Sequence, residues 1–310
     1  METVPQISVL MLTRNHAPFI EQAMASVQAQ TLWPQLELLV GDDASNDGTS
    51  ALVAAAAGQH PGRIRTWYSP EGALGFHHNF ARLLAAARAP YVAFLEGDDW
   101  WCDPSKLQQQ LALLESAPEL AFCGCRTQLW PESGEIGPPA GVRRLGFAEL
   151  VASYSFHTSS VLMRRSAIEL PAWTFQQYCL DRPLYLLAAC HGDAGVIDAV
   201  MSVYRQHPGG VWSSLTPLQQ ARRSAQLFAA MERAFGLERA ALFRQALRPI
   251  LCSYLEQAFA SRRRAEAAAI VLLIAHSSPM GFALARPAAL ARSLRWALAA
   301  GRRLVLLPQP

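Results

Sequence analysis

Lysine is almost missing from this 310-residue chain, and charge of either sign is scarce. Lys106 is the single lysine, the other 26 basic residues are arginines, and charged residues make up 16% of the sequence. The formal net charge of +3 is a weak attraction for a phosphate backbone, which argues against a nucleic-acid-binding protein. Because 51% of the residues are hydrophobic, the composition also excludes a disordered chain and predicts one or two folded domains.

A disulfide framework and a cysteine-based metal site are missing as well. The six cysteines are scattered, and the Cys123-Gly-Cys125 segment lacks the two-residue gap of a zinc knuckle or a redox pair. The first residues, METVPQ, contain no basic segment ahead of an apolar run, so no signal peptide is predicted. Free thiols and the missing signal together predict a cytoplasmic protein.

Charge is unevenly spread along the chain. Residues 1–214 carry 13 basic and 20 acidic side chains, a net charge of −7, whereas residues 215–310 carry 14 basic and 4 acidic ones, a net charge of +10. Such an asymmetry indicates an anionic partner for the basic part. We therefore expect two regions, an acidic domain over residues 1–214 and a helical, Ala- and Arg-rich region over residues 215–310.

Strand and helix patterns alternate over the first hundred residues. Apolar runs at 7–12, 36–40, 64–68 and 91–95 predict strands, and the segments at 20–27, 49–57, 79–87 and 103–114 predict helices. This alternation predicts an α/β fold with a mostly parallel, Rossmann-like sheet flanked by helices. Neither GxGxxG nor GxxxxGKS/T follows the first strand, which argues against a nicotinamide-type site and a P-loop.

Polar side chains follow three of these strands, at the edge where such sheets bind ligands. They are Thr13 and Asn15 after the first strand, Asp42-Asp43 after the second and Asp98-Asp99 after the fourth. Adjacent carboxylates repel one another, and Mg2+ or Mn2+ bound to carboxylates and substrate phosphates relieves that repulsion. One isolated Asp-Asp pair is more often a polar turn, but two pairs at one edge favour a site for a nucleoside diphosphate.

Three segments carry a more specific signal: ISVLMLTRN at 7–15, LELLVGDDASNDGT at 36–49 and APYVAFLEGDDWWCDPSKLQQQ at 89–110. In this order they resemble the successive signatures of the family 2 glycosyltransferases, and the resemblance covers about residues 5–212. It implies the GT-A fold, with residues 1–214 as the catalytic domain. It also implies a bacterial enzyme of polysaccharide or cell-envelope synthesis that transfers a sugar with inversion.

The resemblance assigns roles to the polar residues at the sheet edge. It places Thr13 and Asn15 under the nucleotide and the base against Asp43, whose carboxylate accepts from a uracil or thymine imide. Asp98 is then expected to bind the ribose hydroxyls. Asp99 is expected to ligate the Mn2+ or Mg2+ ion that bridges the diphosphate.

Further residues match the family pattern around the donor. Gly75 and Asn79 resemble the segment that closes over the nucleotide sugar, and Arg205 is a candidate for contact with the diphosphate. Glu96 stands where many members of the family have an aspartate. Two readings of the Trp100 and Trp101 rings stay open, stacking on a sugar face or packing in the core.

Asp181, in the segment CLDRPLY, matches the position of the family's catalytic base. Many members have Glu-Asp at this place, whereas this chain has Leu180-Asp181, so a single carboxylate is available. The alternative is that Asp181 serves as an N-cap of the following helix, and the two roles are compatible.

Histidines offer further candidates in two segments. His207, in YRQHPGG, resembles a residue that completes the metal shell or contacts the diphosphate, and a loop histidine without a role is the alternative. His157, Thr158 and Ser159 resemble the segment that lines the acceptor side.

The expected reaction is transfer of one sugar from a UDP- or dTDP-sugar to a hydroxyl of a glycan or a lipid-linked acceptor. A sugar nucleotidyltransferase is one alternative, but its Gly-rich, basic loop after the first strand is missing from TRNHAPF. A catalytically inactive sugar-nucleotide-binding or scaffold protein is the other alternative, against which the intact Asp98, Asp99 and Asp181 argue.

The basic region at 215–310 is expected to be helical. Its most apolar stretch, residues 267–285, is interrupted by polar residues and Pro279, so it does not match an uninterrupted membrane span. Arginines interleaved with apolar residues fit helices lying on an anionic membrane, such as the inner face of the cytoplasmic membrane. A solvated basic face or a homodimer contact explains the same pattern.

Overall fold

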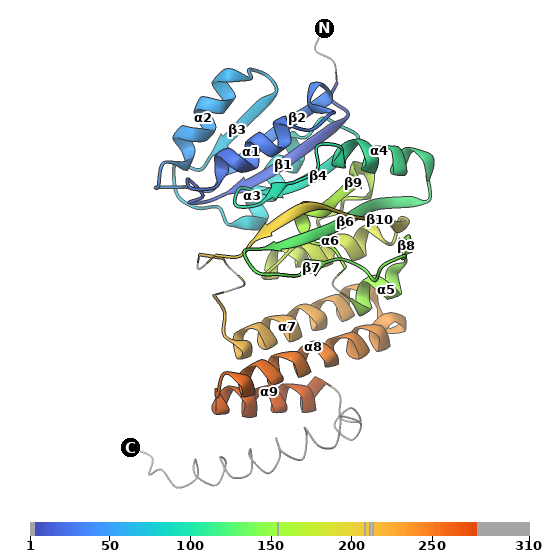
Figure 1. Ribbon diagram of the computed structural model, residues 1–310. Coiled ribbons are helices and arrows are strands. Elements are labelled where there is room, and N and C mark those ends of the chain that lie inside the picture. Colours follow the sequence, from blue (N-terminus) through green and yellow to red (C-terminus); the bar gives the residue numbers. More distant parts are fainter. Residues whose placement is uncertain (1–3, 154, 208, 211, 213, 278–310) are drawn as a thin grey trace. The chain divides into compact units, whose positions relative to one another are not determined.

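The chain divides into two compact units, residues 1–206 and residues 207–310. The computed structural model describes residues 4–153, 155–207, 209–210, 212 and 214–277 (Figure 1). The first unit is an α/β unit, and the described part of the second is helical. The division falls a few residues before the boundary expected at residue 214.

Four parallel strands form the N-terminal half of the sheet. They are β1 (Ile7–Thr13), β2 (Leu36–Asp42), β3 (Ile64–Tyr68) and β4 (Tyr91–Glu96), in the order β3-β2-β1-β4. The helices α1 (Ile20–Gln28), α2 (Thr49–Gln59) and α3 (Phe76–Ala86) connect them. Every residue of β1 and β2 is buried, as expected for parallel strands covered on both faces. The predicted α/β alternation is confirmed here.

The sheet becomes mixed beyond β4. The strand β9 (Val161–Arg164) runs antiparallel to both β4 and β6 (Leu120–Trp130), and β6 runs parallel to β10 (Asp193–Arg205). The short strands β5 (Trp100–Trp101), β7 (Glu135–Ile136) and β8 (Arg144–Leu145) pair in antiparallel fashion. The expectation of a mostly parallel sheet therefore describes the first half better than the second. Because β9 is antiparallel, it begins at the edge where β4 and β6 end.

The remaining helices of the first unit are α4 (Lys106–Ser116), α5 (Phe147–Ala152) and α6 (Asp181–Ala188). Short 3-10 turns, written η, lie at η1 (Trp33–Gln35), η2 (Thr158–Ser160), η3 (Arg165–Ala167) and η4 (Ala172–Gln176). Apolar residues of α1 and α4, such as Met24 and Leu107, join those of β1 and β2 in one hydrophobic cluster.

The only lysine of the chain lies inside this unit. Lys106 is fully buried, its Nζ donates to Gln110 Oε1 over 2.8 Å, and it lies 4.4 Å from the centroid of the Trp101 ring. Burial lowers the pKa of Lys106 to about 8. Trp101 is buried as well and donates from Nε1 to the carbonyl of Ser159, so its ring packs in the core.

A buried carboxylate lies near the amino end of β2. Glu37 is 1% exposed and accepts from Ser8 Oγ over 2.6 Å and from Arg88 Nε over 2.9 Å. Burial raises the pKa of Glu37, but the hydrogen bonds from Ser8 and Arg88 outweigh that effect and lower it overall. This carboxylate is therefore stabilised in its charged form by protein groups alone.

The second unit contains α7 (Pro217–Phe235), η5 (Leu237–Arg239), α8 (Ala240–Ala260) and α9 (Arg264–Ser277). Thr216 caps α7 in a capping box with Gln219, and Phe243 of α8 packs against the aromatic side chains of α7. The predicted helical character is confirmed for residues 217–277. Among the described residues, no helix combines the length and apolar character that crossing a membrane requires. The rest of the basic region, residues 278–310, lies outside the described residues.

Candidate active site

The carboxyl ends of β1, β2 and β4 lie side by side, and the predicted polar residues follow them. The register pairs Thr13 with Asp42 and Leu12 with both Gly41 and Glu96. The start of β9 joins the same edge from the opposite direction. The predicted collection of polar groups from three strand ends is therefore present in one place.

The first Asp-Asp pair accepts hydrogen bonds from protein groups. Asp42 is 1% exposed and accepts from the backbone and hydroxyl of Ser45 and from the hydroxyl of Ser50. Asp43 is 5% exposed and accepts from the backbone N–H groups of Leu74 and Gly75 over 2.6 and 3.0 Å. Asp43 thus fixes the loop that leads into α3, next to the place predicted for the base.

Two residues that were predicted to close over the nucleotide sugar make structural contacts in this region. Asn79 is 1% exposed, donates to the carbonyl of Gly41 over 2.9 Å and accepts from Arg82 Nε over 2.8 Å. Gly75 has a φ of +83°, which glycine adopts readily, and begins α3. Asn79 therefore ties α3 to β2, and the roles of both residues toward a donor stay predictions.

Thr13 and Asn15 lie on the loop after β1. The hydroxyl of Thr13 is buried, and Oγ1 has no hydrogen-bond partner within the described part of the chain. Asn15 accepts from the backbone of Asn46 over 3.0 Å, and its own N–H donates to Ser45 Oγ over 2.8 Å. These contacts join the loops after β1 and β2, and the roles of Thr13 and Asn15 toward a nucleotide stay predictions.

The second Asp-Asp pair, Asp98 and Asp99, lies close to the carboxyl group of Glu96. Asp99 is 2% exposed, and burial together with the charges of Asp98 and Glu96 raises its pKa well above the ordinary range. Burial and the Asp98 charge raise the pKa of Glu96 to about 8. Glu96 Oε2 is buried and has no hydrogen-bond partner among the described residues. Burial and mutual repulsion therefore oppose ionisation of both carboxyl groups.

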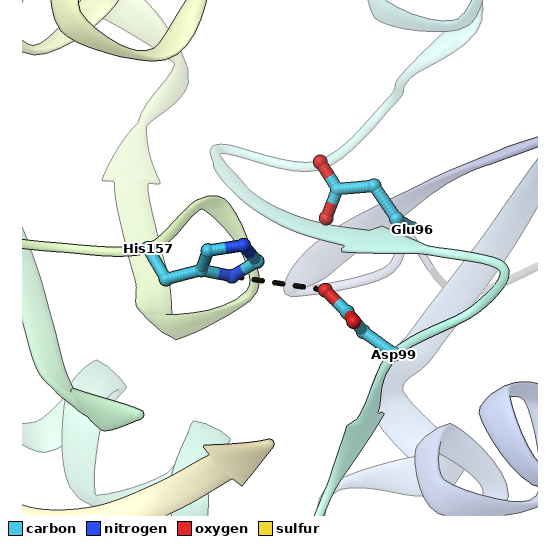
Figure 2. A group of neighbouring side chains, drawn as sticks. All are labelled: Glu96, Asp99 and His157. Carbon is cyan, nitrogen blue, oxygen red and sulfur yellow. Dashed lines mark ion pairs between the residues drawn. The ribbon is translucent and has the colours of Figure 1, made fainter. Parts of the chain in front are cut away.

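His157, just before the turn η2 that leads into β9, faces these carboxyl groups, as Figure 2 shows. Its Nδ1 lies 3.7 Å from Asp99 Oδ2 and 2.8 Å from the hydroxyl of Ser159. The imidazole stacks on Tyr204 with ring centroids 4.4 Å apart. Burial lowers the pKa of His157 to about 4, against the opposing charges of Asp181 and Asp98, so the ring is neutral at neutral pH.

A divalent metal ion fits this group of side chains. One ligand atom each from Glu96, Asp99 and His157 lies within 4.8 Å of the others. Two carboxylates and a neutral imidazole are suitable metal ligands, and the unpartnered Glu96 oxygen provides a free donor. We call Glu96, Asp99 and His157 the carboxylate–histidine cluster. The expected contribution of Glu96 was limited to its place in the motif, and His157 was expected on the acceptor side.

Asp181 is the first residue of α6 and lies near the cluster. Its charge raises the pKa of both Glu96 and His157, which requires proximity to these groups. A hydrogen bond from the Thr158 side chain opposes this rise in the pKa of Glu96. The candidate base and the predicted acceptor-side residues therefore gather around one end of β4, although their roles stay predictions. His207 begins the second unit, and its predicted metal role stays a prediction as well.

Known proteins resemble this chain in sequence and in fold. A family model described as glycosyl transferase family 2 matches residues 8–169. The uncharacterized protein Mb1547 of Mycobacterium bovis is 32% identical over 214 residues, which are 67% of this chain and 61% of the relative. The chain thus spans about three fifths of the length of this relative.

Two solved structures share the fold. The crystal structure of Staphylococcus aureus TarS 1–349 in complex with UDP-GlcNAc has a TM-score of 0.66 at 14% identity, over 94% of this chain and 89% of TarS 1–349. The mannosyltransferase PcManGT of Pyrobaculum calidifontis, in complex with GDP-Man and Mn2+, has a TM-score of 0.59 at 19% identity, over 98% of this chain and 88% of PcManGT.

The mixed sheet with its polar edge is therefore that of a GT-A fold. The chain belongs to glycosyl transferase family 2. Both statements confirm the expectation from the sequence motifs.

Proposed function

We propose that this protein is a metal-dependent, inverting glycosyltransferase that moves a single sugar from a nucleotide sugar to an acceptor hydroxyl. The carboxylate–histidine cluster carries the proposal, because it gathers metal ligands beside the candidate base Asp181 at the carboxyl end of β4. The family membership and the GT-A fold support the same reaction.

The donor is proposed to lie across the ends of β1, β2 and β4. Asp43 would hold a uracil or thymine base, so a UDP- or dTDP-sugar is favoured. Thr13, whose hydroxyl has no hydrogen-bond partner among the described residues, and Asn15 would lie under the nucleotide, and Asp98 would bind the ribose. Calorimetry with UDP-, dTDP- and GDP-sugars tests this choice, and preferential binding of a GDP-sugar would contradict it.

Glu96, Asp99 and His157 would hold the metal ion, which when bound neutralises the charge of the leaving diphosphate. A mixed carboxylate and imidazole set favours a transition metal such as Mn2+ over Mg2+, which prefers oxygen ligands. The neutral state of His157 leaves a nitrogen lone pair for ligation.

Asp181 is proposed to take the proton from the acceptor hydroxyl as that oxygen attacks the anomeric carbon. The diphosphate leaves from the opposite side of the carbon, so the anomeric configuration inverts. The pocket has to hold the acceptor oxygen, the anomeric carbon and the leaving oxygen in line, a positioning effect of the residues around the end of β4. His157, Thr158 and Ser159 are proposed to border the acceptor.

The acceptor is proposed to be a glycan or a lipid-linked saccharide of the bacterial cell envelope, met by a cytoplasmic enzyme at the inner face of the membrane. The net charge of +10 over residues 215–310 supports contact with an anionic surface. Sedimentation with vesicles of anionic and of neutral lipids tests it. A homodimer through the second unit is the alternative, which binding to neither vesicle and a dimeric mass would favour.

Release of nucleoside diphosphate is the direct test of the reaction. We expect release from one nucleotide sugar in a panel, only with Mn2+, and acceleration by a lipid-linked saccharide. The anomeric configuration of the product, read from its NMR coupling constants, reports inversion. Failure of all donors to bind or react, with and without Mn2+, would overturn the proposed function.

A further inference from the structure

The turn that carries Asp98 and Asp99 is held from one side by a single residue, Arg205. The backbone N–H of Arg205 donates to Asp99 Oδ1 over 2.9 Å. Its side-chain Nε donates to the carbonyl of Asp98, also over 2.9 Å. Arg205 is the last residue of β10, so the end of one strand secures the loop that follows another.

The guanidinium of Arg205 lies among three aromatic rings. Its Cζ is 4.5 Å from the ring centroid of Trp100, 4.7 Å from that of Phe19 and 5.1 Å from that of Trp130. Gln22 accepts from Nη2 over 2.5 Å, and the residue is 9% exposed. Cation–π contacts strengthen when the cation is removed from water, so the rings keep the guanidinium in this position.

These contacts give the guanidinium a role within the protein, beside the expected contact with the diphosphate, which stays a prediction. The motif suggested contact with the diphosphate, whereas the contacts of Nε and Nη2 go to Asp98 and Gln22. Both hydrogen bonds to the Asp98–Asp99 turn run from Arg205 to groups that cannot move without displacing the carboxylates. The Arg205 side chain thus acts on the cluster through the backbone of the turn, whereas its backbone N–H holds the Asp99 carboxylate directly.

We propose that Arg205 is a positioning residue for the metal ligands, which fixes the Asp98–Asp99 turn before any metal ion binds. The proposal rests on the proposed metal-dependent function. A charged donor to a backbone carbonyl makes a stronger hydrogen bond than a neutral one, and the aromatic rings prevent the donor from rotating away. The turn is then preorganised, so metal binding does not have to order it.

The test compares Arg205→Met, Arg205→Lys and a matched control, Arg164→Met. Arg164 also lies over an aromatic ring, 5.6 Å from Tyr91, and donates to the carbonyls of Leu114 and Leu120, but it lies at the other end of β4. Arg205→Lys keeps the charge and loses the Nε donor. Titration with Mn2+, followed by electron paramagnetic resonance, gives the affinity of each full-length protein.

We expect both Arg205 variants to bind Mn2+ about 10- to 100-fold more weakly, because loss of an outer partner of a metal ligand has effects of this size. Arg164→Met is expected to stay within about twofold of the wild type. Unchanged or tighter Mn2+ binding by Arg205→Met would overturn the proposal, since the guanidinium would then act only as a repelling charge.

A second measurement needs no metal. The amide of Asp99 donates to the carbonyl of Glu96 over 3.1 Å, and its hydrogen exchange reports the stability of the turn. We expect faster exchange in peptides covering residues 96–101 of Arg205→Met, and unchanged exchange in Arg164→Met. Unchanged exchange in both overturns the role of Arg205, even if Mn2+ binds. Absence of Mn2+ binding by the wild type would instead contradict the metal site of the proposed function.

Discussion

Two Asp-Asp pairs lie at one edge of the sheet and differ in their surroundings. Protein donors satisfy Asp42 and Asp43, which accept hydrogen bonds from serines and from the loop before α3. Asp99 lies beside other carboxyl groups, and its burial together with their charges raises its pKa. The same dipeptide thus stabilises a loop at one strand end and contributes to the proposed metal site at the other. The difference lies in the donors that the neighbouring segments supply.

The largest expected effect concerns the base beside the second pair. Asp181→Asn removes the proton acceptor, so sugar transfer should fall by about 10²- to 10⁴-fold while nucleotide-sugar binding stays within about twofold. Diphosphate release with acceptor present measures the first quantity, and calorimetry measures the second. Asp193→Asn is a matched control, because Asp193 pairs with Arg144 at the start of β10. Transfer by Asp181→Asn at a near wild-type rate would remove Asp181 from this role.

The variants Asp99→Asn and Asp42→Asn test whether the two Asp-Asp pairs differ in metal binding and in their contribution to stability. Loss of the Asp99 charge should weaken Mn2+ binding at least about a hundredfold, since even outer partners of metal ligands contribute 10- to 100-fold. The metal-free protein should not lose stability, because the substitution relieves repulsion from Asp98 and Glu96. Asp42→Asn should show the reverse, normal Mn2+ binding and a loss of about 1–3 kcal/mol in unfolding free energy. Similar Mn2+ affinities and similar unfolding free energies of the two variants would contradict the proposed difference between the pairs.

A smaller effect is expected from the residue before the first pair. A Cβ at Gly41 would collide with Asn79 Oδ1 and lie 3.1 Å from Leu83 Cδ1, so Gly41→Ala should lower the unfolding free energy by about 1–3 kcal/mol. Urea unfolding measures this change. Gly58→Ala in α2, where a Cβ meets no atom within 4 Å, should instead raise stability by about 0.4–1 kcal/mol. An unfolding free energy that Gly41→Ala leaves unchanged would show that α3 is free to move away from β2.

The smallest effect extends the comparison to Glu37, another carboxylate satisfied by protein donors. Glu37→Gln should cost about 1 kcal/mol at neutral pH, since Arg88 is 41% exposed and water screens part of the attraction. The pKa of Glu37 is lowered in the folded state, so its contribution is present above the ordinary value of 4.5 and is lost as the pH falls through the folded pKa. Urea unfolding at decreasing pH should show the two proteins converging. A difference that is constant with pH would point to packing instead of charge.

Sequence patterns predict the first half of the fold well and the second half less well. Apolar runs and caps locate β1 to β4 within one or two residues, because buried parallel strands are continuous hydrophobic segments. The strand β10, Asp193–Arg205, is harder to recognise, since its first part carries Gly195 and Asp198, which weaken the apolar pattern. The direction of β9 cannot be read from periodicity at all.

The antiparallel direction of β9 also determines which residues of the site could be predicted from the sequence. Residues that follow parallel strands, such as Asp43 and Asp99, are found by looking for strand ends. His157 precedes a strand, so it reaches the same edge only because β9 runs the other way. The contact of Arg205 with the diphosphate stays a prediction from the motif. Its partners within the protein come from three distant segments that share no local signal, so sequence patterns did not predict them.

The burial of Lys106 makes the chain unusual as a target for chemical labelling. Amine-reactive reagents need an exposed, unprotonated ε-amine, and the only one in the sequence lies under Trp101 and is bonded to Gln110. Acylation of this lysine therefore requires the α4 region to open. The rate at which Lys106 is acylated therefore reports the rate of unfolding of the first unit. Mass spectrometry can follow this acylation without an engineered probe.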